Sequence, residues 1–188
     1  MADELRGMRI AFVATDGVEQ VELTEPWSAV QSAGARPLLV SMKPGTIQGF
    51  NHLDKADTFT VDLESSKANF DEFDALVLPG GVANPDALRI HPPTVSFIRR
   101  FAEVGKPIAV ICHGPWTLVE ADVVRGRTLT SWPSLKTDIR NAGGEWRDEE
   151  VFVCTSGPGT ITSSRKPADL PAFNRTLISE FAKISTRS

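Results

Sequence analysis

The feature that most constrains the fold is a regular alternation of short apolar runs with segments of helical spacing. The apolar runs predict buried strands, and they cover residues 8–14, 36–41, 73–78, 107–111, 128–130, 151–153 and 160–163. Apolar residues at helical spacing predict helices over residues 19–32, 94–104, 115–121, 134–141 and 168–184. Residues 45–61 indicate a loop or a hairpin. Strands that alternate with helices predict an α/β fold, with a mostly parallel sheet and helices on both faces.

Length and charge limit the classes of protein that need to be considered. The chain has 188 residues with 41% hydrophobic and 23% charged residues, so we expect one domain over residues 1–188, with residues 1–7 a loose N-terminal extension. The formal net charge is −4 and no basic stripe is present, which argues against a nucleic-acid partner. The charged start and the absence of a long apolar stretch predict a cytoplasmic protein without membrane contact.

Three polar clusters follow predicted strands directly. They lie at residues 16–19, 80–86 and 112–113. In parallel sheets, ligands bind outside the carboxyl ends of the strands, and these ends share one edge of the sheet. The three clusters are therefore expected to form a single site.

Cys112 is the strongest candidate for chemistry. It ends a predicted strand and precedes a predicted helix, so a tight turn would push its side chain into the shared site. The amides and partial positive charge of a helix N-terminus favour the thiolate, the reactive form of cysteine. We therefore favour a nucleophile over a cysteine that only packs. Cys154 lacks such a setting and is expected to be a packing or edge residue.

Candidate acid and base groups surround this cysteine. His113 could take the thiol proton if a third group holds its ring, and Asp86 is the first choice for that group. The alternatives for Asp86 are a solvated loop carboxylate or a cap. Glu19 could carry a proton at neutral pH if it is partly buried, because burial raises a carboxyl pKa; the alternative is an exposed carboxylate at a helix N-terminus. His52 and His91 are expected at the surface.

Gly80 and Gly81 could present backbone amides to a developing oxyanion, together with the amide of His113. A tight structural turn is the competing explanation. The sequence has no Cys-x-x-Cys or His-x-x-x-His pairing for a metal, and no Gly-x-x-x-x-Gly-Lys-Ser/Thr loop for nucleotide phosphates. We therefore expect neither a metal nor a nucleotide.

With these residues in place, the chain resembles the PfpI family of the class I glutamine amidotransferase-like superfamily, to which the parkinsonism-associated deglycase and glyoxalase III also belong. The resemblance runs from about residue 8 to residue 181. It rests on EQVEL at 19–23, FDALVLPGG at 73–81, GKPIAVICHGP at 105–115, ADVVRGR at 121–127, NAGG at 141–144 and SRKPADL at 164–170.

The resemblance implies a flavodoxin-like three-layer sandwich, no cofactor, and a homodimer or a hexamer built from dimers. It implies that Cys112 is the nucleophile beside His113, that Glu19 contacts the sulfur, and that Asp86 completes a triad, often across a subunit boundary. Relatives usually carry glutamate at the position of Asp86. Trp132 stands where many relatives carry tyrosine, and it is expected to form part of the pocket wall.

The resemblance also bears on activity. We expect a cofactor-independent stress-defence enzyme of glyoxalase III or deglycase type, acting on small dicarbonyls such as methylglyoxal or on the adducts they form with amino groups. Two alternatives use the same cysteine. One is an intracellular cysteine peptidase, and the other is a redox-sensing or chaperone-like stress protein. A small pocket would favour dicarbonyls, and an open groove would favour peptides.

Overall fold

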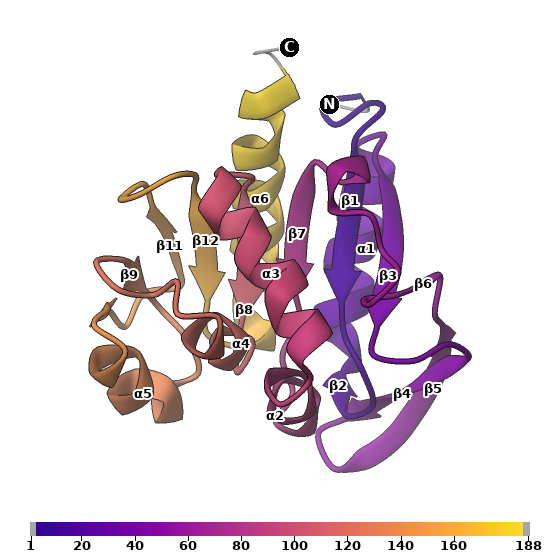
Figure 1. Ribbon diagram of the computed structural model, residues 1–188, viewed down its shortest axis with the longest axis horizontal. Coiled ribbons are helices and arrows are strands. Elements are labelled where there is room, and N and C mark those ends of the chain that lie inside the picture. Colours follow the sequence, from indigo (N-terminus) through magenta and orange to yellow (C-terminus); the bar gives the residue numbers. More distant parts are fainter. Residues whose placement is uncertain (1–2, 186–188) are drawn as a thin grey trace.

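The computed structural model describes residues 3–185 and contains a central sheet of seven strands (Figure 1). The strand order is β11-β12-β8-β7-β1-β3-β6, and every neighbouring pair is parallel except β11 and β12. The bounds are β1 Arg9–Val13, β3 Arg36–Ser41, β6 Leu63–Glu64, β7 Ala75–Leu78, β8 Ile108–Ile111, β11 Val151–Cys154 and β12 Ile161–Ser164. The predicted mostly parallel sheet is confirmed.

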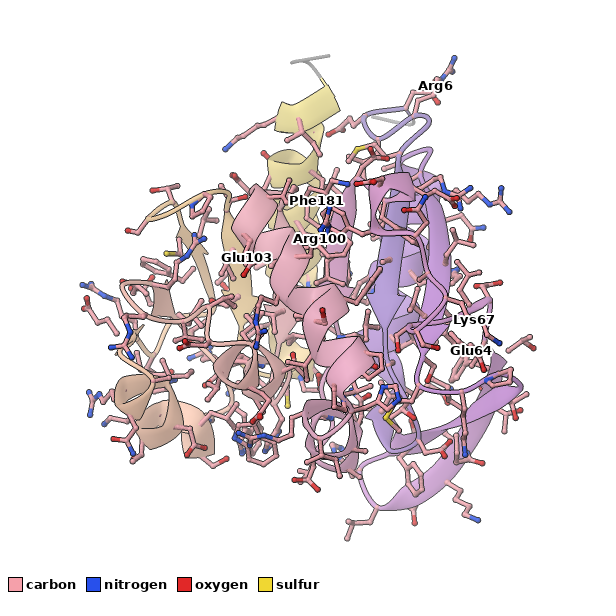
Figure 2. All side chains as sticks on the ribbon, viewed as in Figure 1. Arg6, Glu64, Lys67, Arg100, Glu103 and Phe181 are labelled. Carbon is pink, nitrogen blue, oxygen red and sulfur yellow. The ribbon has the colours of Figure 1, made fainter. Side chains whose placement is uncertain are left out.

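Helices cover both faces of the sheet (Figure 1). The first face carries α1 (Gln20–Ser32) and α6 (Leu170–Ser185), and the second carries α2 (Ala83–Arg89), α3 (Pro92–Val104), α4 (Pro115–Glu120) and α5 (Lys136–Asn141). Side chains alternate between the faces of a strand, so Phe12 of β1 packs toward α1 and α6 while Val13 packs toward α3. Phe181 of α6 is fully buried in the first layer (Figure 2). The flavodoxin-like sandwich is therefore confirmed.

The path of the chain through the sheet fixes the place of a ligand site. From β1 the chain adds β3 and β6 on one side, then returns to add β7, β8 and β12 on the other. Ligands of open α/β sheets bind at such a reversal, outside the carboxyl ends of the strands. The loops after β1, β7 and β8 meet at this point.

Two small sheets flank the central one. The predicted hairpin within residues 45–61 forms β4 (Thr46–Asn51) and β5 (Asp54–Thr60), and β4 also pairs with the short β2 (Val18–Glu19). The strand predicted at residues 128–130 is β9 (Thr128–Leu129), but it pairs with β10 (Glu145–Trp146) outside the central sheet. Three short 3-10 turns complete the elements, at Phe70–Glu72, Pro133–Leu135 and Pro167–Asp169.

The structure differs from the sequence-based expectation in two places that matter below. Residues 83–89, expected as a loop, form helix α2. Pro85 is tolerated because a missing N–H costs little in a first turn. Residues 3–7 are not a loose extension, since Leu5 is fully buried and its N–H donates to the Ala33 carbonyl at 2.9 Å; residues 1–2 lie outside the described part. Within residues 3–185, no helix is both long and apolar enough to cross a bilayer.

Candidate active site

The turn after β8 gives Cys112 a left-handed backbone conformation, with φ of 61°. Such a conformation costs a residue other than glycine on the order of 1–3 kcal/mol, so neighbouring contacts must hold it. The Cys112 N–H donates to the Ser164 carbonyl at 3.0 Å, and its carbonyl accepts from the Trp132 N–H at 3.0 Å. The predicted tight turn is present, and it holds the buried thiol between β8 and α4.

Two backbone amides lie against the Cys112 sulfur, those of Gly81 and His113, and both lower the pKa of the thiol. Glycine is required beside them. A Cβ on Gly80 would lie 2.7 Å from the Cys112 Cβ, and a Cβ on Gly81, where φ is +78°, would lie 2.4 Å from a backbone oxygen. This geometry matches the amide pair expected from the sequence, with the amide of Gly80 directed instead to a carboxyl group.

That carboxyl group belongs to Glu22, not to Glu19. Glu22 is fully buried, and it interacts with the Cys112 thiol and the Gly80 N–H, although neither of its oxygens completes a hydrogen bond of ordinary geometry. The expectation that Glu19 contacts the sulfur therefore has to be corrected. Glu19 ends β2, and its carboxylate accepts from the His52 N–H at 3.1 Å. Because α1 starts only at Gln20, its first turn carries Glu22 back toward the thiol.

The pKa of Glu22 is raised from its usual 4.5 to about 8, mainly by burial and to a smaller extent by the charge of Glu19, against the lowering effects of the contacts with Cys112 and Gly80. Glu22 therefore holds a proton at neutral pH. A carboxylic acid beside a sulfur can give up that proton when charge develops and take it back later. The buried carboxyl group beside the sulfur is therefore Glu22, three residues further along the chain than Glu19, the residue expected from the sequence.

Burial also raises the pKa of the Cys112 thiol, and a negative charge on Glu22 raises it further. This is opposite in direction to the thiolate expected from the helix N-terminus. Desolvation of the sulfur is the largest effect on this thiol, and it outweighs the lowering effect of the two amides. Protonation of Glu22 removes the effect of its charge but leaves the effect of desolvation, because the sulfur stays buried. The thiol must therefore be ionised by a base at the moment of attack.

His113 is placed to be that base. Its Nδ1 lies 3.1 Å from the Cys112 Sγ, and burial lowers the pKa of the imidazole, which is therefore neutral and able to accept a proton. Its ring packs against two tryptophans. Trp132 stacks on it with ring centroids 5.7 Å apart and an interplanar angle of 23°, and Trp116 meets it at 5.2 Å and 65°.

A cavity of about 560 Å³ opens onto the sulfur. Its polar lining includes Glu19, Glu22 and His113, and its apolar lining includes Phe50 of β4 and Trp132. The predicted wall position of Trp132 is thereby supported. His52 has an exposed side chain, as expected, but it also lines the cavity, a role that its place in the sequence did not reveal.

Asp86 lies on α2, exposed to solvent, rather than in a loop. In the described part of the chain, no hydrogen bond joins it to His113. The side chain that fixes this region is Asn84, which sequence reasoning missed: its Oδ1 accepts from the Thr15 N–H at 2.7 Å, and its Nδ2 donates to the Gly80 carbonyl at 2.9 Å. No local sequence signal identifies it, because its partners come from the loops after β1 and β7.

The other candidates separate clearly from the site. Cys154 is buried and its Sγ accepts from the Thr128 N–H at 3.3 Å, in agreement with a packing residue. His91, expected at the surface, is half-buried, and its Nδ1 lies 2.8 Å from the Thr94 hydroxyl oxygen, away from the site. Among the residues described, no group of three or more His, Cys, Asp or Glu side chains could hold a metal ion.

Comparison with known proteins finds similar sequences and structures. A family model described as the DJ-1/PfpI family matches residues 8–180. The chain is 43% identical over 177 residues to deglycase PH1704 of Pyrococcus horikoshii, covering 94% of this chain and 99% of that protein. It is 41% identical over 169 residues to protein/nucleic acid deglycase 2 of Escherichia coli, covering 89% and 94%. A solved two-domain protein from Anabaena variabilis, with DJ-1/ThiJ/PfpI-like and ferritin-like domains, has a TM-score of 0.84 at 31% identity; the match covers 92% of this chain and 47% of that one.

Proposed function

Because the chain belongs to the DJ-1/PfpI family, we propose that it is a cofactor-independent cysteine enzyme of the deglycase type. Its substrates would be reactive dicarbonyls such as methylglyoxal and the adducts they form with amino groups. The observation that carries the proposal is the buried Cys112 thiol, held between the base His113 and the protonated carboxyl of Glu22, at the floor of the cavity.

The size of the cavity favours the adduct as substrate, because the adduct is larger than the free dicarbonyl. Pockets for small molecules measure roughly 300–1,000 Å³, and this cavity of about 560 Å³ exceeds the needs of a three-carbon molecule. The remaining space would receive the amine part of an adduct against the apolar side chains of Phe50 and Trp132.

The geometry supports the following chemistry for an adduct of methylglyoxal and an amine. Nδ1 of His113 takes the thiol proton while the Sγ of Cys112 bonds to the carbinol carbon, and the amine leaves with a proton. A proton then moves from this carbon to the neighbouring carbonyl carbon through an enediol, with Glu22 and His113 as carriers. The resulting thioester is hydrolysed by water, which releases a hydroxyacid and restores the thiol. The amides of Gly81 and His113 stabilise the oxyanion.

The proposal is tested by incubating the purified protein with methylglyoxal, with methylglyoxal-treated N-acetyl amino acids and with a peptide panel, each beside Cys112→Ala. Release of free amine and hydroxyacid by the wild type alone supports the proposal. Cleavage of peptides without turnover of any adduct would replace it with the peptidase alternative.

A redox role of the same cysteine is the second candidate, and the contact between Glu22 and the sulfur favours it. Two equivalents of hydrogen peroxide would convert the thiolate to a sulfinate and release two equivalents of water, and the Glu22 carboxylic acid would donate a hydrogen bond to the product. Mass spectrometry of the protein after mild peroxide treatment should show this species at Cys112, and in smaller yield in Glu22→Gln. Equal yields would remove Glu22 from this role.

A homodimer, or a hexamer of dimers, stays a prediction, as does the cytoplasmic location.

We propose that Asp86 reaches His113 of a second copy, because it is exposed on α2 beside the exposed apolar side chains of Val82 and Ile90. Mixing inactive Cys112→Ala with inactive Asp86→Ala chains should then restore part of the activity, since some sites would combine both wild-type residues. No recovery after demonstrated subunit exchange, or full activity of Asp86→Ala alone, would reject the shared site.

A further inference from the structure

The two tryptophans beside His113 are both hydrogen-bonded through their backbones to Cys112 and His113. The backbone N–H of Trp132 donates to the carbonyl of Cys112 at 3.0 Å, and the backbone N–H of Trp116 donates to the carbonyl of His113 at 3.1 Å. Trp132 directly precedes the turn Pro133–Leu135, and Trp116 lies in the first turn of α4. Two separate segments of the chain therefore place aromatic rings against one imidazole.

Each tryptophan is also held from outside the site. The Nε1–H of Trp116 donates to Asp138 of α5 at 2.8 Å, and the Arg89 guanidinium lies 5.6 Å from the centre of its ring. At Trp132 it is the backbone that is held, because the Ser131 hydroxyl donates to the Trp132 carbonyl at 2.8 Å. These contacts fix the ring of Trp116 directly, and they fix the segment from which the partly exposed ring of Trp132 packs on His113.

The ring of His113 has one polar contact in the described structure, from Nδ1 to the Cys112 sulfur at 3.1 Å. Little else fixes its orientation except the aromatic packing. The face of an indole is electron-rich and attracts a cation, more strongly when water is excluded. Trp132 lies nearly parallel to the imidazole, so it offers this face to the imidazolium that forms when His113 takes the thiol proton.

We propose that Trp132 and Trp116 are positioning residues, which hold Nδ1 of His113 on the Cys112 sulfur and stabilise the imidazolium, with Asp138 acting through Trp116. This inference rests on the proposed function only in taking Cys112 as the nucleophile. The role differs from that of a pocket wall, because it alters proton transfer between two protein groups before any substrate binds.

Titratable and charged groups on the elements packed around His113 have to be kept constant in a test. They are Glu19 of β2, Glu22 of α1, Asp86 and Arg89 of α2, Glu120 of α4 and Asp138 of α5, of which Arg89 and Glu120 form an ion pair. Substitution of Trp132 removes none of them and none of their contacts given above. A change in the titration of His113 then reports the loss of the ring itself.

The test measures the pKa of His113 by NMR and the pH dependence of Cys112 alkylation by a neutral reagent, both without substrate. Trp132→Leu should lower the pKa of His113, and should reduce the alkylation rate at neutral pH roughly three- to tenfold relative to the wild type, the range expected for loss of a cation–π contact. Trp132→Phe keeps an aromatic face and should stay within about twofold. Trp27→Leu, at a half-buried tryptophan that packs on Phe12 of β1, is the matched control and should change neither value.

A further variant keeps the test decisive if Trp132→Leu does not fold. Trp116→Phe removes the N–H that Asp138 accepts while the charge of Asp138 stays, so it should lower the pKa of His113 by a smaller amount. An unchanged or raised pKa of His113 in the folded Trp132 and Trp116 variants would overturn the proposal, even if the KM for substrate rises. Because no substrate is used, failure here is distinct from absence of deglycase activity.

Discussion

The two cysteines of the chain are both buried at the ends of strands, yet their surroundings differ in every respect that controls reactivity. Cys112 lies in a left-handed turn after a parallel strand, with a carboxylic acid, an imidazole and two amides around its sulfur. Cys154 ends the antiparallel edge strand β11, and its sulfur accepts one N–H from Thr128. Burial alone therefore does not mark a reactive cysteine; the groups that can exchange a proton with it do.

The largest expected difference between the two regions is in turnover. Cys112→Ser should reduce adduct hydrolysis by about a thousandfold or more, because the weaker nucleophile cannot be ionised by His113. Cys154→Ser should keep activity within about twofold and lose some stability from the buried site. Steady-state kinetics of both variants, with a denaturation curve for each, make the comparison. Comparable losses of turnover would contradict the assignment.

The next largest effect separates the two glutamates beside Cys112. Glu22→Gln should lower turnover by about a hundredfold, the scale of a general acid–base contribution. Glu19→Gln is the matched control three residues away, and turnover of neutral methylglyoxal should fall by less than about tenfold, because Glu19 lines the cavity without contacting the sulfur. The reverse order of the two effects would restore the role first expected for Glu19.

Substitution of Gly81 tests the amides around the sulfur. Gly81→Ala adds a Cβ that would lie 2.4 Å from the Gly17 carbonyl oxygen, so the loop must move and its amide must leave the sulfur. We expect a loss of turnover of about tenfold to a thousandfold, as for removal of one oxyanion-hole donor. Gly45→Ala is a control at a glycine that also has positive φ but open space around it. Full activity of Gly81→Ala would contradict the amide assignment.

A smaller effect is the pH dependence of stability. The pKa of Glu22 is about 8 in the folded protein and 4.5 as an ordinary value, so the folded state holds more protons between these pH values. The contribution of Glu22 to the free energy of unfolding is then fully present below pH 4.5. It is lost as the pH rises to 8, by at most about 1.4 kcal/mol per pH unit. Glu22→Gln should lack this loss. Chemical denaturation of both proteins at several pH values between 5 and 8 measures it, and parallel curves would contradict the raised pKa.

Much of this difference between the cysteines could be predicted from the sequence, because the strand-to-helix turn at Cys112 and the double glycine at Gly80 leave clear local patterns. The choice between Glu19 and Glu22 could not. It depends on the residue at which α1 begins, and helix starts shift by one or two residues when no capping side chain marks them, as at Glu19 here.

The direction of the pKa change of Cys112 could not be predicted from the sequence either. The local pattern shows the helix that follows the cysteine but not the depth of burial, and burial determines the direction of the pKa change. Likewise, the short helix that contains Asp86 has Asn84 and Pro85 in its first turn, residues that usually indicate a loop. Its buried Asn84 is explained only by contacts with the distant residues Thr15 and Gly80.

The central claim is that a protonated Glu22 lies beside the Cys112 sulfur at neutral pH. Infrared difference spectroscopy of the wild type against Glu22→Gln tests it most directly, because a carboxylic acid and a carboxylate absorb at different frequencies. We predict a carboxylic acid band at pH 6 that disappears as the pH rises through about 8, the pKa of Glu22. A carboxylate band at pH 6, with no carboxylic acid band assignable to Glu22, would contradict the account.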